Sequence, residues 1–224
     1  MKLNHYFPRL RRQAFTLVEL LVVMAIIAAL AAILFPVFSG IKKSGAIKKT
    51  RAQLQKVVLA IEAYKAQHGH YPQDNPDNPA VNPLFYELAG TKLIDGKYQT
   101  ETGEGNLSNG DLPTFFGGPR VSGFVNVSRG SGDEAQNAKN YLVGISASDY
   151  LAVVTNNVTG IVLGTSIKGP VMLTATNDAS INPFRYVSTG PTNNPNHFDL
   201  WVDIIVGGKT NRISNWREKE QIVP

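Results

Sequence analysis

The sequence predicts an α+β protein in which a long N-terminal helix carries a small head built on an antiparallel β-sheet. Residues 20–38 form an apolar run without a single charge. An apolar stripe at helical spacing then continues to about residue 68, so the helix should extend that far. Beyond residue 100, short runs rich in β-branched residues alternate with Gly, Asn and Ser, which is typical of short strands joined by turns.

The distribution of charge argues against a nucleic-acid partner. The chain has 224 residues and a formal net charge of +5. Four of its 22 basic residues lie in residues 1–14, which hold no acid, and the remaining 18 stand against 17 acidic residues. The excess therefore belongs mainly to a short basic leader, where it acts in targeting. The chain has no cysteine, which excludes disulfides, thiolate metal sites and cysteine nucleophiles.

The apolar run has the length of a membrane span. Its nineteen residues would form a helix about 28 Å long, close to the hydrocarbon thickness of a bilayer. Pro36 is the one helix breaker in the run, and we expect it to kink the helix because proline removes a backbone hydrogen bond.

Glu19 is an acid at the start of this apolar segment, where a carboxylate costs on the order of 3 kcal/mol unless it has a partner. A cleaved secretory signal peptide could use residues 29–31 as its A-x-A site, but the apolar run continues past them. A plain signal anchor would leave the acid incidental. A cut between Ala14 and Phe15 creates an amine four residues before Glu19, on the same chain or on a neighbouring copy. Glu19 favours this third interpretation.

The stretch "AFTLVELLVVMAIIAALAAILFP", residues 14–36, resembles the N-terminal signature of type IV pilins and type II secretion pseudopilins. The resemblance implies that a prepilin peptidase cuts between Ala14 and Phe15 and methylates the new amine of Phe15. It also implies that Glu19 neutralises this amine on an adjacent subunit during assembly. Pro36 falls where many members of the family have proline. Ala14 departs from the usual glycine, but it is small and we expect processing.

The resemblance divides the chain into a leader (1–14), a transmembrane and assembly helix (15–38) and an extracytoplasmic head (39–224), together a pilin-like lollipop. It places the leader in the cytoplasm and the head in the periplasm. Charge alone leaves the orientation open, because six cations in residues 42–56 follow the apolar run and four precede it. Those six cations contact lipid head groups or neighbouring copies, or they form a solvated helix face.

Local signals outline the head. The amphipathic helix 39–68 should end at Gly69, because glycine is a common C-cap and Pro72 forbids continuation. Asn82 is a candidate N-cap for a short helix that ends near Gly90. Residues 100–175 read as an insertion rich in strand and loop, which forms a specific surface patch or merely decorates the fold. Within it, β-prone runs cover 121–128 (as an exposed strand), 140–146, 149–155, 159–165 and 170–176.

The C-terminal end, "NPFRYVSTGPTNNPNHFDLWV", resembles that of the major (G-type) pseudopilins, as does the Ile-Ser-Asn-Trp tail at 213–216. In that family a calcium ion is held between these two segments. Here Asp199 and Asp203 are the only side chains that could ligate it, and Lys209 and Arg212 stand where the family is acidic. Because calcium needs six to eight oxygen ligands and is opposed by nearby cations, we expect no cofactor.

Nothing in the sequence argues for catalysis. It contains no nucleotide-binding, nucleophile-elbow or H-E-x-x-H motif. His68 and His70 could form a two-histidine metal site, but a helix end followed by a turn explains them better. We therefore expect no enzyme but a structural subunit of a type II secretion pseudopilus. The resemblance implies as partners a prepilin peptidase, other copies, minor pseudopilins, an inner-membrane assembly platform and lipid. A type IV pilus or DNA-uptake pilin, and a non-polymerising membrane-anchored binding module, are the alternatives.

Overall fold

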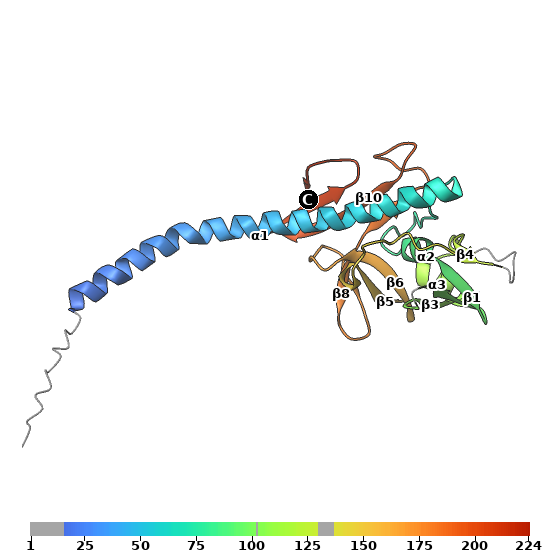
Figure 1. The fold of residues 1–224 in the computed structure, drawn as a ribbon, viewed down its shortest axis with the longest axis horizontal. Coiled ribbons are helices and arrows are strands. Elements are labelled where there is room, and N and C mark those ends of the chain that lie inside the picture. The colour runs from blue at the N-terminus through green and yellow to red at the C-terminus, as the bar shows by residue number, and fades with distance from the viewer. Residues whose placement is uncertain (1–15, 102, 130–136) are drawn as a thin grey trace, which may run out of the picture. The chain divides into compact units, whose positions relative to one another are not determined.

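The computed structural model describes residues 16–101, 103–129 and 137–224, without the side chains of residues 33–41. The chain divides into two compact units, residues 1–42 and 43–224. Helix α1 (Leu17–His68) begins in the first unit and ends in the second. The second unit is the head, and Figure 1 shows its helices and strands.

The part of α1 in the head is amphipathic, as the sequence predicts. Leu54, Val57, Ile61 and Tyr64 lie on one face and are each at most 1% exposed. Their spacing of three and four residues puts them on one stripe of the helix, which packs on the head. The helix ends where expected, because Gly69 adopts a φ of +79° and its N–H donates to the Lys65 carbonyl oxygen at 2.8 Å.

The predicted short second helix is α2 (Leu84–Ala89), and every one of its residues is buried. The N-cap is Pro83 and not the predicted Asn82, whose side chain, just before the helix, still accepts a hydrogen bond from the Leu84 N–H at 3.2 Å. Gly90 follows the helix with a φ of +75°. A buried helix this short has no solvated face, so its one acid, Glu87, is enclosed with the apolar residues.

The described part of the head contains twelve strands in three four-stranded sheets. Their orders are β3-β2-β1-β4, β5-β6-β8-β7 and β12-β11-β10-β9. All pairs are antiparallel except β1 with β4. The remaining elements are β1 (Thr91–Ile94), β2 (Lys97–Thr100), β3 (Asn106–Ser108), η1 (Asn109–Asp111), α3 (Leu112–Phe116), β4 (Val127–Ser128), η3 (Ala147–Asp149), β5 (Tyr150–Thr155), β6 (Val158–Thr165), β7 (Leu173–Thr174), β8 (Ser180–Pro183), β9 (Arg185–Val187), β10 (Asp199–Val206), β11 (Lys209–Ser214) and β12 (Gln221–Val223).

The region predicted as an insertion, residues 100–175, contributes to the core of the head. Phe115 and Phe116 of α3 are each 1% exposed, and Ile161 and Leu163 of β6 are 3% and 2% exposed. Strand β6 also pairs with β8, which joins the region to the C-terminal part of the chain. These residues do more than decorate a complete fold, because the core cluster includes them.

The exposed strand predicted over residues 121–128 is wrong except at its end, where β4 forms. Val121 is fully buried and Phe124 is 5% exposed, stacked on Tyr86 with ring centroids 4.8 Å apart. The backbone N–H groups of Val125 and Asn126 donate to the Glu87 carboxylate instead of to a neighbouring strand. A buried acid thus takes the place of a strand ladder. The β-prone run 140–146 likewise forms no strand.

Candidate functional site

Helix α1 begins with a reciprocal hydrogen-bonded cap between Thr16 and Glu19. The N–H and the hydroxyl of Thr16 each donate to Oε2 of Glu19 at 2.8 Å. The N–H of Glu19 donates in return to Oγ1 of Thr16 at 3.2 Å. This is a capping box, which satisfies donors that the first helical turn would otherwise leave free. The Glu19 carboxylate therefore lies against the backbone N–H of the residue that directly follows Phe15.

The other predicted residues of the N-terminal site are not described. Ala14 and Phe15, the expected cleavage and methylation positions, lie outside the described residues. Pro36, the expected kink, lies in the stretch whose side chains are not described. The cut, the methylation and the kink remain predictions.

The first half of α1 exposes apolar side chains on all sides. Leu17 is 78% exposed, and even Val23, the least exposed of this set, is 45% exposed. A helix that is apolar all round is normally covered by other protein or by lipid. The set is Leu17, Val18, Leu20, Leu21, Val22, Val23, Met24, Ile26, Ile27 and Leu30. Counting only described residues, no helix reaches the length and hydropathy required for crossing a membrane.

Polar contacts fix the second half of α1 to residues 140–165. The Gln53 amide donates to Oδ1 of Asp149, and its oxygen accepts from the Thr165 hydroxyl at 2.8 Å. Burial alone would raise the pKa of Asp149, but hydrogen bonds from the backbone of Ser146 and from Gln53 lower it. The Lys56 ammonium donates to the Gly144 carbonyl oxygen at 2.6 Å. The helix is thus attached to the head by matched polar groups as well as by its apolar face.

Glu87 is a second buried acid against α1. Its carboxylate accepts from the Tyr64 hydroxyl at 3.0 Å and from the N–H groups of Val125 and Asn126 at 2.9 and 3.1 Å. Burial raises the pKa of Glu87, and these donors oppose the rise. Burial also raises the pKa of Tyr64, which keeps its hydroxyl protonated as a donor. The cluster joins α1, α2 and the loop before β4.

The two predicted calcium ligands lie on the same strand, β10, with three residues between them. Four residues of strand span about 13 Å, so Asp199 and Asp203 cannot share one ion whose ligands lie about 2.4 Å away. Asp203 forms a two-pronged ion pair with Arg212, at 2.8 and 2.9 Å. Oδ2 of Asp199 accepts from Thr192 and Asn193, while its Oδ1 has no donor among the described residues.

These carboxylates do not fit a calcium ion at this place. One free carboxylate oxygen is far from the six to eight that calcium needs, and Arg212 brings a positive charge to Asp203. Across the described ranges, no group of three or more His, Asp or Glu side chains could hold a metal. We therefore derive nothing from calcium.

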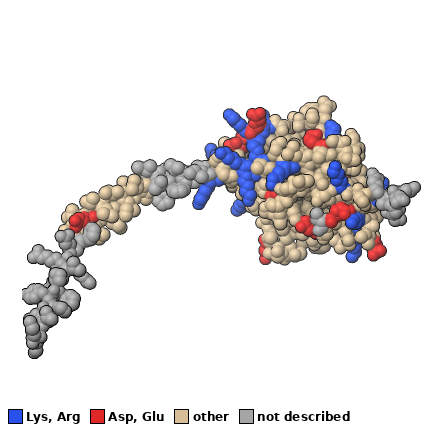
Figure 2. Space-filling model, in the orientation of Figure 1, with Lys and Arg blue, Asp and Glu red and all other residues tan. Residues whose placement is uncertain are grey.

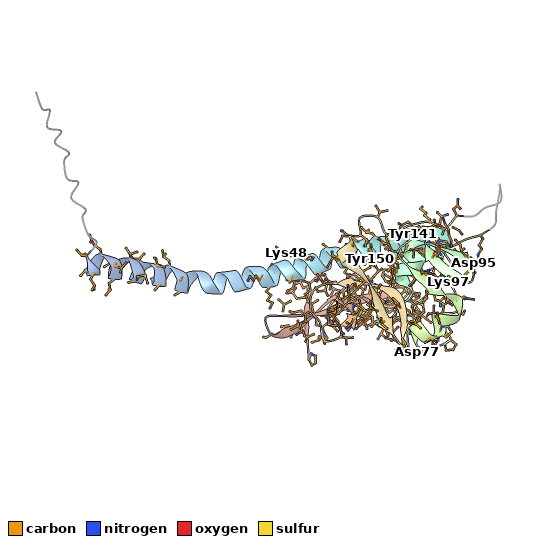
Figure 3. The ribbon with its side chains drawn as sticks, turned by 90° about the horizontal axis from the view of Figure 1, so that it is seen from below. Lys48, Asp77, Asp95, Lys97, Tyr141 and Tyr150 are labelled. Carbon is orange, nitrogen blue, oxygen red and sulfur yellow. The ribbon has the colours of Figure 1, made fainter. Side chains whose placement is uncertain are left out.

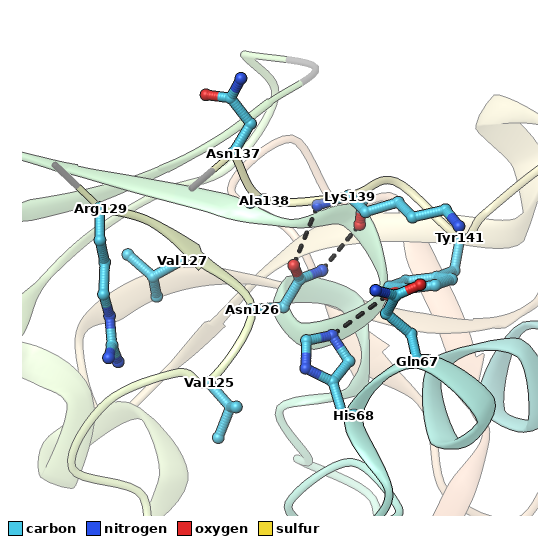
Figure 4. Close-up of a pocket in the computed structure, with 10 residues that line it drawn as sticks. All are labelled: Gln67, His68, Val125, Asn126, Val127, Arg129, Asn137, Ala138, Lys139 and Tyr141. Carbon is cyan, nitrogen blue, oxygen red and sulfur yellow. Dashed lines mark hydrogen bonds between the residues drawn. The ribbon is translucent and has the colours of Figure 1, made fainter. Parts of the chain in front are cut away.

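A pocket of about 320 Å³ lies beside the C-terminal end of α1 (Figure 4), but its polar groups serve structure. The Asn126 amide donates to the carbonyl oxygen of Lys139 at 2.7 Å, and its oxygen accepts from the Lys139 N–H at 3.0 Å. His68 bonds the Tyr141 hydroxyl at 3.1 Å and stacks on Tyr64 with centroids 4.2 Å apart. His68 therefore belongs to the helix end, as the sequence suggests.

Sequence reasoning missed two of these contacts. The Thr-x-x-Glu spacing at residues 16–19 is the signature of a capping box, but the sequence prediction paired Glu19 only with the new amine of Phe15, on the same chain or on a neighbouring copy. The role of Glu87 had no local signal, because its backbone donors lie 38 and 39 residues away.

Comparison with known proteins supports the N-terminal assignment. The family profile described as the prokaryotic N-terminal methylation motif matches residues 9–35. No curated protein and no solved structure gave a significant match. The matched motif is found in structural pilin-type proteins, and it implies processing by a prepilin peptidase, membrane anchoring and assembly with other pilin subunits. The chain thus carries a type IV pilin-like prepilin signal, with Glu19 and the ten exposed apolar side chains of residues 17–30 inside the matched segment.

Proposed function

We propose that this protein is a structural subunit of a type II secretion pseudopilus. A prepilin peptidase would process it at Ala14–Phe15, and the mature chains would leave the inner membrane and polymerise through their N-terminal helices. One observation carries the proposal: the segment matched by the methylation motif includes ten large apolar side chains that are each at least 45% exposed. Such a surface needs lipid before assembly and other copies after it.

The energetics of assembly follow from that helix. Burying a large apolar side chain stabilises a protein by about 1.5–3 kcal/mol, so stacking the helices of many copies supplies a large driving force. The Glu19 carboxylate, held at the helix start by Thr16, would pair with the Phe15 amine of a neighbouring copy. An external ATPase would supply the work of extraction from the membrane, because the sequence contains no nucleotide-binding motif.

The choice of a secretion pseudopilus over a type IV pilus or DNA-uptake pilin rests on the C-terminal resemblance. In the head, Asp199 and Leu200 of the Phe-Asp-Leu segment begin β10, and Ile213 and Ser214 of the Ile-Ser-Asn-Trp tail end β11. Trp201 of β10 pairs with Ser214 of β11, and the Trp201 and Trp216 rings lie edge to face with centroids 5.9 Å apart. The two resembling segments therefore meet in one sheet.

The mature N-terminus tests processing. Mass spectrometry of the chain purified from membranes should find a methylated Phe15 as the first residue. Replacing Ala14 with glycine should preserve that product, and Ala14→Leu should block it because the residue before the cut is small. A chain that begins at Ala32, or an intact Met1, contradicts the proposal.

Formaldehyde cross-linking in cells that express the secretion system tests assembly. Glu19→Leu should abolish the ladder of cross-linked copies and secretion while leaving the head folded. Glu62→Leu is the matched control, because Glu62 is an exposed acid on the head part of α1. Unchanged ladders in Glu19→Leu would refute the pairing, and the absence of ladders in the unmodified protein would favour a non-polymerising binding module.

A further inference from the structure

The end of the head where the packed part of α1 begins is rich in cations that form no ion pair with any described residue. Residues 20–61 contain six Lys and Arg and no acid. Lys43 is the first residue of the head unit, and Lys48 and Lys49 follow it, both exposed. Figure 2 shows Lys and Arg gathered at this end, and in Figure 3 Lys48 lies there while Asp95 and Lys97 lie at the opposite end.

The fold adds cations from distant parts of the sequence to the same surface. The turn between β10 and β11 is the pair Gly207–Gly208, both with positive φ, and a Cβ added to Gly207 would lie 3.8 Å from Cδ of Lys43. Lys209 follows this turn and pairs with Val206.

On the other edge of β10, the N–H of Ile205 donates to the Lys168 carbonyl oxygen at 2.7 Å. Residues 43, 168 and 209, called here the basal lysines, therefore flank one hairpin tip.

The basal lysines have the properties of a surface for an anionic partner. None of the three forms an ion pair among the described residues, and Lys168 and Lys209 are exposed. Ile205, at the end of β10 between them, is a large apolar side chain that is 38% exposed. Cations around an exposed apolar side chain are typical of surfaces that lie at a membrane interface, where the cations bind head groups and the apolar group enters the acyl boundary.

Sequence distance favours lipid over other anionic partners. Lys43 is five residues past Phe38, the last residue of the apolar run, and five residues of helix rise about 7.5 Å. Lys48 and Lys49 come about 15 Å past that end, still within reach of the head-group layer for a side chain of this length. Cations this close along the chain to a membrane-held segment meet phospholipid before they meet a soluble partner.

We propose that the basal lysines and Ile205 dock the head on anionic phospholipid of the membrane that holds the apolar helix. This inference rests on the proposed function, because it requires the helix to be in the membrane. In this role the contact forms before assembly, and it is released as the subunit enters the filament.

The experiment uses the full-length chain in lipid vesicles. Because the protein has no cysteine, Ser166→Cys places a single environment-sensitive fluorophore at an exposed position two residues from Lys168. The vesicles are either pure phosphatidylcholine or contain about one third phosphatidylglycerol, so that only the second kind carries surface charge. Resistance to carbonate extraction is measured on the same vesicles and reports insertion of the helix.

The expected result is emission at shorter wavelength in the anionic vesicles alone, reversed at about 0.5 M salt because the screening length falls to about 4 Å. K168Q/K209Q should lose this shift. K97Q/K139Q is the matched control with the same net charge: Lys97 lies at the opposite end of the head, and Lys139 lies beside His68 at the far end of α1. The control should keep the shift.

Three results overturn the proposal. A chain that inserts but shows the same emission in both kinds of vesicle refutes lipid docking and leaves the proposed function standing. A shift that depends on protein density and not on lipid charge assigns the surface to a second copy. A chain that fails to insert in either vesicle refutes the anchoring in the proposed function and this inference together.

Discussion

Arg212 of β11 donates two parallel hydrogen bonds to Asp203 of β10, from Nε to Oδ1 at 2.8 Å and from Nη2 to Oδ2 at 2.9 Å. The two residues lie directly opposite each other in the strand pair. The Asp203 side chain is only 10% exposed, so water can replace little of what Arg212 provides. The pair therefore joins the two strands of the C-terminal hairpin through their side chains.

Arg212→Gln should lower the free energy of unfolding by about 2 kcal/mol, because it leaves a mostly buried carboxylate without its cation. Urea unfolding of the full chain in detergent measures this. Arg120→Gln is the control: it breaks the Arg120–Asp77 pair, whose side chains are 57% and 67% exposed, and should cost less than about 0.5 kcal/mol. Equal losses would show that the Asp203 pair contributes no more than a surface contact.

Glu87 should make stability fall as pH rises. Burial raises its pKa above the ordinary value of 4.5, so the folded state holds the proton more tightly than the unfolded chain does. The contribution of Glu87 is then complete below about pH 4.5 and is lost as pH rises through the raised pKa. Glu87→Gln cannot ionise. Urea unfolding at a series of pH values should therefore show that the stability of Glu87→Gln increases relative to that of the wild type as the pH rises.

Tyr64→Phe should change stability relative to the wild type in the opposite direction to Glu87→Gln as the pH rises. The Tyr64 hydroxyl donates to the Glu87 carboxylate and stabilises its charged form more than its neutral form. Losing it should cost about 1 kcal/mol, and the cost should grow with pH. If both variants drift in the same direction relative to the wild type, Glu87 does not control the pH dependence.

Thr16→Ala should loosen the first turn of α1, because it removes the hydroxyl that bonds Glu19 in both directions. Amide hydrogen exchange at residues 18–20 should become several-fold faster in detergent micelles. Thr16→Ser keeps the hydroxyl and should retain wild-type exchange. Identical exchange in the two variants would mean that the capping box does not hold the helix start.

Gly160→Ala tests whether residues 100–175 belong to the core. The added Cβ would lie 2.5 Å from Cζ of the buried Phe115, so the ring or β6 must move, at a cost of about 1–3 kcal/mol. Gly118→Ala is the control, since it has no neighbour within 4 Å and should change stability by less than about 0.5 kcal/mol. Thermal unfolding of both variants decides. Equal midpoints would contradict tight packing around Phe115.

The parts of this fold that the sequence predicted are those with local causes. The stripe through Leu54 and Ile61 and the stop at Gly69 depend on residues within a few turns of each other. The strands that became β5 and β6 were recognisable because each is a β-branched run with turn residues at its ends. Periodicity and capping chemistry are readable in a short window.

The errors have long-range causes. The run 121–128 has strand-like alternation, but its backbone donors are taken by Glu87, which no local window contains. The ion pair between Asp203 and Arg212 also depends on strand pairing, because the register of β10 and β11 places the cation directly opposite the acid. At the N-terminal site, the resemblance pointed to Glu19 as the assembly acid. Its hydrogen bond to Thr16 was missed, because the same residues also form a capping box.

The apolar half of α1 has a consequence for the route a subunit can take. Ten large side chains that are at least 45% exposed make transfer of the naked chain into water unfavourable by on the order of 10–20 kcal/mol. Freely dissolved subunits would therefore be vanishingly rare, and a filament could not grow from an aqueous pool. Growth would have to draw each chain directly from the bilayer at its base, so the growing end of the polymer would stay at the membrane surface for as long as it elongates.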